Sequence, residues 1–172
     1  ISGGLGNSIY DSTSCTIAGG EGNSIIGDQN AVSMDVIGNT ISGGSYNSIL
    51  TDLIDPYPAQ FNTIAGGTSN QIYGDQHSFI GGGYANTTND FGNNGSHNSI
   101  VGGSANAITW GTRWSTIGGG KNNTIDSTSD VNARLNQATI GGGYNNRIES
   151  INGTYIDSPD RKSTRLNSSH RT

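Results

Sequence analysis

Isoleucines recur along the chain in pairs eight residues apart, and the residues between them are polar or glycine. The shared motif is Ile-x-Gly-Gly-x-x-Asn-x-Ile, which occurs eight times, with Thr88 in place of the closing isoleucine once. The first isoleucine lies at positions 1, 17, 41, 64, 80, 100, 117 and 140, so successive copies are 16 to 24 residues apart. Self-similarity at this period indicates a repeat architecture.

Each copy predicts two short β-strands joined by a Gly-Gly turn. Thr-Ile is a β-favouring word, and an even separation places both isoleucines on the same face of the chain. Glycine permits the positive φ of a tight turn, and no segment has the periodicity of a helix. We therefore expect an all-β parallel β-solenoid (a β-roll or β-helix) of about eight irregular coils. The predicted inward-facing residues are Ile17, Ile25, Ile41, Ile49, Ile64, Ile72, Ile80, Ile100, Ile108, Ile117, Ile125, Ile140 and Ile148.

Stacked coils would also bring one asparagine per copy into a single column. Asparagine tolerates turn conformations and can form ladders of side-chain amides, so a structural role is expected. The column would contain Asn7, Asn23, Asn47, Asn70, Asn86, Asn106, Asn123 and Asn146. The only cysteine, Cys15, occupies a position where later copies have small residues, which predicts a packing role.

Two buried isoleucines per coil make a thin core compared with the backbone entropy lost on folding. We therefore expect chains to self-associate, as a trimer or a filament. The repeat domain is predicted at residues 1–148, followed by a degenerate last coil or tail at 149–159. The segment DRKSTRLNSSH, at 160–170, resembles the in-frame translation of a common sequencing adapter, so 160–172 is interpreted as a non-native tail.

Composition limits the classes of partner. The chain has 172 residues, 28 glycines and a net charge of −5, and residues 1–159 contain four basic and twelve acidic residues. Because the only cluster of basic residues lies in the suspect tail, nucleic acid is not an expected partner. No apolar run is long enough to predict a membrane span.

The segment TIGGGKNNTI, from Thr116 to Ile125, superficially resembles a phosphate-binding loop. A P-loop requires Ser or Thr after its lysine, whereas Asn122 follows Lys121. Since the segment is also a copy of the repeat, we interpret its glycines as a structural turn.

Little in the sequence indicates catalysis. Outside the tail, the histidines are His77 and His97, and neither belongs to a metal-ligand spacing or a recognisable triad. We expect a non-catalytic protein without a metal ion or cofactor.

Longer coils have insertions after the closing isoleucine, predicted to project from one edge of the solenoid. Within TWGTRW, the residues Trp110, Arg113 and Trp114 form a candidate contact loop for sugars or a protein partner. The proline-containing segment DPYPAQF offers a second candidate through Tyr57 and Phe61.

The words NSIIG, at Asn23–Gly27, and NSIVGG, at Asn98–Gly103, resemble the head repeats of trimeric autotransporter adhesins. FIGGGYANTT and TIGGGYNNRI are similar to the Ile-Gly-Gly-Gly-Tyr-x-Asn repeats of bacterial and viral fibre proteins. The resemblance covers residues 1–148 and implies a structural or adhesive segment of a fibre. It implies an extracellular, cell-surface or virion-surface location, with glycans or host cells as partners.

Two alternatives remain. An ice-binding solenoid would use a regular threonine face, and a threonine column is interrupted by Phe79 and Ser99; its members are Thr16, Thr40, Thr63, Thr116 and Thr139. A polysaccharide-acting viral tail spike would need paired carboxylates.

Overall fold

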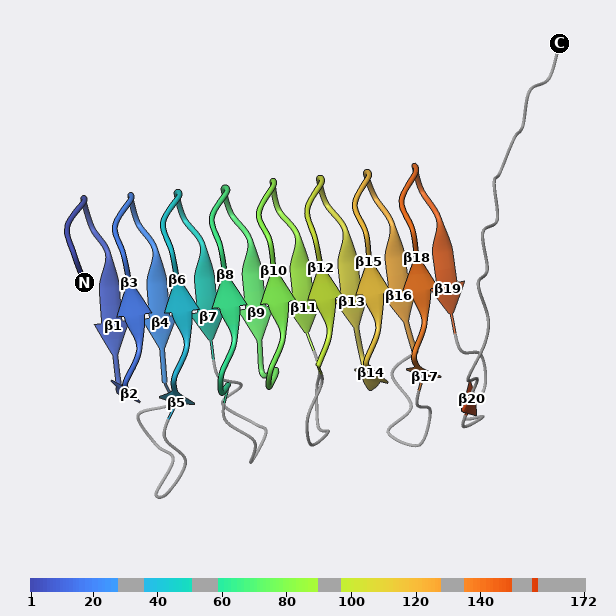
Figure 1. Ribbon diagram of the computed structural model, residues 1–172, viewed down its shortest axis with the longest axis horizontal. Coiled ribbons are helices and arrows are strands. Elements are labelled where there is room, and N and C mark those ends of the chain that lie inside the picture. The colour runs from blue at the N-terminus through green and yellow to red at the C-terminus, as the bar shows by residue number, and fades with distance from the viewer. Residues whose placement is uncertain (28–35, 51–58, 90–96, 128–134, 150–155, 158–172) are drawn as a thin grey trace, which may run out of the picture.

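The protein is a stack of coils in which each turn of the chain adds one strand to each of two parallel sheets (Figure 1). The computed structural model describes residues 1–27, 36–50, 59–89, 97–127, 135–149 and 156–157. Strands of successive coils pair in parallel, with Ile17 opposite Ile41 and Ile25 opposite Ile49. The predicted all-β parallel β-solenoid is confirmed.

The first sheet has seven strands, each made from the Thr-Ile word or its equivalent. They are β3 (Thr16–Ile17), β6 (Thr40–Ile41), β8 (Thr63–Ile64), β10 (Phe79–Ile80), β12 (Ser99–Ile100), β15 (Thr116–Ile117) and β18 (Thr139–Ile140). The second sheet has eight strands, each around the closing isoleucine position. They are β1 (Ser8–Tyr10), β4 (Ser24–Ile26), β7 (Ser48–Leu50), β9 (Gln71–Tyr73), β11 (Thr87–Asn89), β13 (Ala107–Thr109), β16 (Thr124–Asp126) and β19 (Arg147–Glu149).

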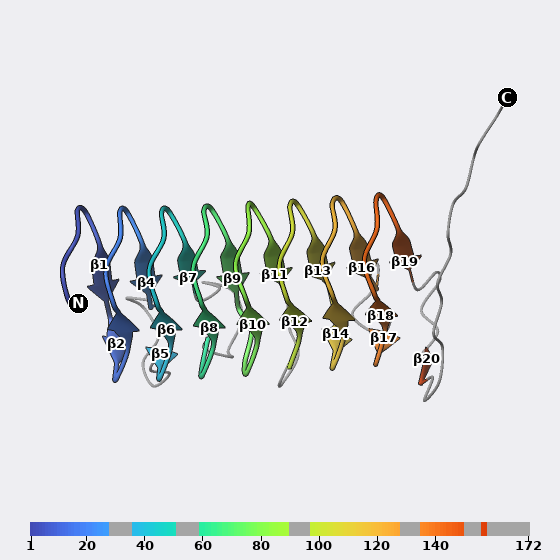
Figure 2. The same cartoon turned by 45° about the horizontal axis from the view of Figure 1, so that its top comes forward.

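A third side closes each coil and is less continuous than the two sheets (Figure 2). Its strands are β2 (Ser12–Thr13), β5 (Val36–Ile37), β14 (Thr112–Arg113), β17 (Leu135–Asn136) and β20 (Ile156–Asp157). Bridges from Ile37 to Gln60 and from Gln60 to Gln76 extend the β2–β5 half of this side toward the middle of the stack.

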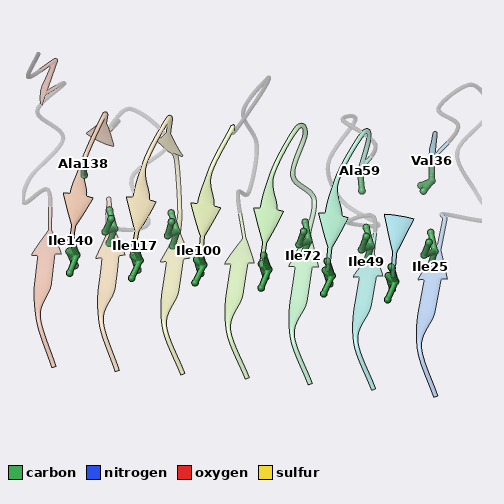
Figure 3. Packing of buried hydrophobic residues seen from close by; sticks show 14 of the residues in the cluster. Ile25, Val36, Ile49, Ala59, Ile72, Ile100, Ile117, Ala138 and Ile140 are labelled. Carbon is green, nitrogen blue, oxygen red and sulfur yellow. The ribbon is translucent and has the colours of Figure 1, made fainter. Parts of the chain in front are cut away.

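The interior is filled by columns of isoleucine along the stack (Figure 3). Of the predicted core residues, Ile140 is 4% exposed, Ile148 is only partly buried against the cluster, and all the others are fully buried. The third side adds core residues that the sequence analysis missed, namely Val36, Ala59 and Leu135, and Ala138 from the small-residue position also joins the core. The core is therefore thicker than two isoleucines per coil, and a single chain covers it.

The asparagine that all copies of the repeat share forms a continuous hydrogen-bonded column. Asn86 is typical: its backbone N–H and its Nδ2 donate to Oδ1 of Asn70 at 3.0 and 3.1 Å. Nδ2 also donates to the carbonyl of Gly82 in the same coil at 2.8 Å and to that of Gly103 in the next coil at 3.1 Å. One side chain thus satisfies polar backbone groups in neighbouring coils, which is what a buried polar residue requires.

The second glycine of each turn makes this arrangement possible. Gly83 has φ +91°, and a Cβ there would lie 2.1 Å from the Gly103 carbonyl oxygen and 2.8 Å from Asn86 Nδ2. Any side chain would therefore separate the coils at the point where the asparagine amide binds.

Coils differ in length mainly at one place, the segment that follows the second-sheet strand. Residues 28–35, 51–58, 90–96, 128–134 and 150–155 each follow the second-sheet part of a coil, so the predicted projection of the insertions concerns residues outside the described part of the chain. TWGTRW is different, because β14 within it forms part of the third side. Its interpretation as a projecting insertion was wrong: the 17-residue spacing from Ile100 to Ile117 uses this segment to close the coil.

The asparagine column gives a matched test in adjacent residues. Asn123→Ala should lower the free energy of unfolding by about 3 kcal/mol, because it removes the side-chain hydrogen bonds to the Gly119 and Gly143 carbonyls and to the Asn146 N–H. Asn122 is half-buried at a left-handed corner where other coils have Ala85 and Ala105, so Asn122→Ala should cost no more than about 1 kcal/mol. Denaturant unfolding of both variants checks this, and equal losses would contradict a special role for the column.

A substitution at Thr88 is expected to stabilise the protein. Its side chain is fully buried in the isoleucine column, opposite Ile72 and Ile108, and its hydroxyl has no hydrogen-bond partner. Thr88→Val replaces the hydroxyl with a methyl group of similar size and should raise the free energy of unfolding by about 1–2 kcal/mol. The converse change, Ile108→Thr, should lower it by about 2–3 kcal/mol. Denaturation midpoints that move the other way would show that Thr88 is not a core position.

Candidate functional site

An exposed column of side chains lies at the corner that precedes the first sheet. One residue of each coil adopts a left-handed backbone conformation there, with φ from +49° to +69°. The column contains Ser14, Gly38, Phe61, His77, His97, Trp114 and Gln137. Because equivalent corners stack directly, side chains at this position are neighbours across coils.

Four successive members of this column carry rings, and we call them the corner stack: Phe61, His77, His97 and Trp114. The Phe61 and His77 ring centroids are 5.2 Å apart with an interplanar angle of 15°. The His77 and His97 centroids are 4.8 Å apart at 19°, and those of His97 and Trp114 are 6.2 Å apart at 37°. The first three rings therefore stack face to face along the solenoid axis, and the indole is tilted. Phe61 and Trp114 remain 51% and 50% exposed.

Backbone hydrogen bonds hold these corners in place. The N–H of Phe61, His77 and His97 each donate to a carbonyl of the preceding coil, at 2.9 to 3.0 Å. The chain then turns inward at the next residue, which belongs to a second polar column. There Ser78 Oγ accepts from the Asn98 N–H, and Asn98 Oδ1 accepts from the Ser115 N–H, both at 3.1 Å.

Cys15 starts this second column. Its Sγ lies 3.4 Å from the Asn39 backbone nitrogen and accepts its N–H, as the Asn39 and Asn62 side-chain oxygens do for the following coils. The small-residue position identified in the sequence is therefore a column of hydrogen-bond acceptors that reaches the Ala138 N–H. What its members share, apart from Ala138, is an acceptor atom as well as small size.

The predicted contact residues are divided between two places. Trp114 and Phe61 belong to the corner stack although 53 residues separate them in sequence (114 − 61). Trp110 is 39% exposed at the corner on the other side of β14, and Arg113 is half-buried on β14 between them. Tyr57 lies outside the described residues.

His77 and His97 were missed as site residues because they were considered singly. The signal was available, because aligning the copies backward from the Thr-Ile word places both histidines two residues before it, like Phe61 and Trp114. In the part of the chain that the structure describes, no group of three or more His, Cys, Asp or Glu side chains could hold a metal ion.

Lys121 and its glycines form a repeat turn. The N–H groups of Gly118 and Lys121 donate to the carbonyls of Ile140 and Gly143, and the N–H of Asn122 donates to Ser104. A P-loop binds phosphate with backbone N–H groups, and these three are engaged in holding the coils together.

Two smaller polar clusters lie elsewhere on the surface. Asp126 and Glu149 face each other across β16 and β19, and Arg147 makes ion pairs with both, at 3.4 and 2.9 Å. At the turn after the first sheet, the Tyr46 hydroxyl donates to the Glu21 carboxylate at 3.1 Å. That hydrogen bond, together with the negative charge of Glu21, raises the pKa of Tyr46.

Comparison with known proteins gives no match from which a function could be inferred. Neither the protein-family models nor the curated proteins nor the solved structures that were searched match this chain. Within the described residues, no helix is long and apolar enough to cross a membrane.

The turn at Lys121 can be tested by two adjacent substitutions. Lys121→Ala should change neither the melting temperature nor any affinity for ATP, since the exposed lysine side chain extends from a structural turn. Gly120→Ala should unfold or strongly destabilise the protein, because a Cβ there would lie 2.1 Å from the Gly143 carbonyl oxygen. Isothermal titration with ATP and thermal melting check both, and ATP binding that Lys121→Ala abolishes would revive the P-loop interpretation.

Proposed function

We propose that the chain is a non-catalytic structural and adhesive segment of a surface fibre, extracellular or on a virion. The observation that carries this proposal is the unbroken stacking of eight coils in register. At a strand spacing of about 4.8 Å, eight coils make a rod segment about 35–40 Å long. The resemblance to adhesin head repeats and fibre repeats supports the same function.

Such a rod offers contacts as columns on its outside. Exposed aromatic residues occur at several corners and include Tyr46, Phe61, Tyr84, Trp110, Trp114 and Tyr144. Aromatic side chains supply large contact areas for sugars and proteins, and repeated weak contacts along a rod favour multivalent attachment. Glycans or host-cell surfaces are therefore the proposed partners.

Self-association forms part of this proposal. On the outer edge of the second sheet, Tyr10, Ile26, Leu50 and Tyr73 pair in register and form an apolar row. Copies of the chain could cover these rows in a trimer or a filament, since exposed apolar rows favour association between chains. The row becomes polar or acidic in later coils, where Asn89, Thr109, Asp126 and Glu149 occupy the same position.

Ice binding is a second candidate, favoured by one observation. The threonines of the first sheet are in register, from Thr16 opposite Thr40 to Thr116 opposite Thr139. Phe79, which is 38% exposed, and Ser99 divide the row into two parts. A divided row presents less regular hydroxyl spacing than a flat ice-binding face would need.

The fibre proposal predicts binding that depends on the tryptophans. Trp110→Ala combined with Trp114→Ala should weaken binding to cells or immobilised glycans by about tenfold or more, because exposed aromatics dominate such contacts. Tyr84→Ser combined with Tyr144→Ser is the matched control at another corner, and it should have a smaller effect. Light scattering and electron microscopy of the full chain should show associated rods in both variants.

Other outcomes would replace the proposal. Dispersed monomers that depolymerise a polysaccharide would identify a tail-spike enzyme, with Asp126 and Glu149 as the first acids to substitute. Thermal hysteresis that increases in Phe79→Thr would identify an ice-binding protein.

A further inference from the structure

The centre of the corner stack consists of two histidines from successive coils. His77 and His97 have nearly the same backbone conformation, with φ +55° and +49°, and both side chains are exposed. The backbone N–H groups of His77 and His97 donate to the Gln60 and Gln76 carbonyls at 2.9 and 3.0 Å, which fixes the backbone at both corners. The two imidazoles therefore extend from equivalent, anchored positions one coil apart.

Stacking determines which parts of the imidazoles solvent can reach. Phe61 covers one side of His77, His97 covers the other, and Trp114 lies against the far side of His97. Each imidazole thus has neighbouring rings on both sides along the stack, and both side chains remain exposed at the corner. Phe61 and Trp114 have no metal-binding nitrogen, so they act as walls on either side of the histidine pair.

We propose that His77 and His97 together bind one divalent late transition-metal ion, with Cu²⁺ preferred over Ni²⁺ and Zn²⁺. Imidazole nitrogen is a good ligand for these ions, and Cu²⁺ is the strongest binder among them in the general affinity order. Water would complete the coordination. Ca²⁺ and Mg²⁺ are not expected to bind to this histidine pair, because both ions require oxygen ligands.

The separation of the two rings is compatible with one shared ion, provided that both rings turn. Two nitrogens bound to the same ion at about 2.0–2.1 Å are roughly 3–3.4 Å apart. The histidine centroids are 4.8 Å apart, but their planes are only 19° from parallel and the nitrogen lone pairs lie in those planes. Binding one ion therefore requires the two imidazoles to turn out of the stack until their nitrogens converge, and both side chains are exposed and have room to turn. Stacking alone does not require histidine, since Phe61 and Trp114 occupy the same column.

Trp114 provides a direct optical test, since its ring is 6.2 Å from that of His97 and bound Cu²⁺ should quench its fluorescence. The full chain would be made without a histidine tag and would carry Trp110→Phe, so that Trp114 is the only reporter, and His170→Ala, to remove the third histidine. Titration with Cu²⁺ should give saturable quenching at one ion per chain, with an apparent Kd in the micromolar range, about 1–50 μM. Ni²⁺ should bind more weakly.

His77→Phe and His97→Phe are matched control variants, because each keeps an aromatic ring in the stack and removes one ligand. Each should weaken Cu²⁺ binding about tenfold or more, and the double variant should abolish saturable quenching. Saturating Cu²⁺ should raise the melting temperature of the parent protein and leave that of the double variant unchanged.

Two results would overturn the metal site. One is the absence of saturable quenching up to about 1 mM Cu²⁺, and the other is quenching that the double variant retains with the same midpoint. Circular dichroism would establish that each variant is folded, and His77→Gln with His97→Gln replaces the phenylalanine pair if that pair fails to fold. The metal site and the fibre function are independent, since the first is measured on dissolved chains and the second on cells or glycans.

Discussion

The side-chain amide of the column asparagine sets the distance between coils. In each coil it donates to a carbonyl of its own Gly-Gly turn and to one of the next turn, and it accepts from the following asparagine. These bonds lie where the backbone of successive coils approaches closely, so the second glycine of the turn cannot carry a side chain. The isoleucine columns stack in register because this polar column fixes one coil against the next.

A fixed register has a direct consequence for the surface. Every outward position becomes a column, and the left-handed corners place one exposed side chain per coil at the same point along the stack. Residues 16 to 20 apart in sequence, such as Phe61, His77 and His97, thereby become ring-stacking neighbours. In a solenoid, surface chemistry is built along a line, and each coil can vary its contribution without disturbing the others.

The scaffold tolerates variation where hydrogen bonding is preserved. In the second polar column, sulfur, hydroxyl and amide oxygen all accept the next backbone N–H. The isoleucine column tolerates Thr88, whose hydroxyl has no partner, because each coil contributes only part of the total stability. Adhesive and metal-binding functions would use this freedom, since exposed corners can change while the amide column and the turn glycines stay fixed.

The repeat alone determined the solenoid, the inward isoleucines and the asparagine column, because these features lie within nine consecutive residues of each copy. The residues that vary between copies were assigned less well. Val36, Ala59 and Leu135 were not expected in the core, and TWGTRW was interpreted as an insertion although it closes a coil. The ring contacts of the corner stack depended on tertiary structure. Alignment of the copies on the Thr-Ile word places the four residues at one position of the repeat. Only the hydrogen bonds between coils make that position an exposed corner where His77 and His97 stack between Phe61 and Trp114.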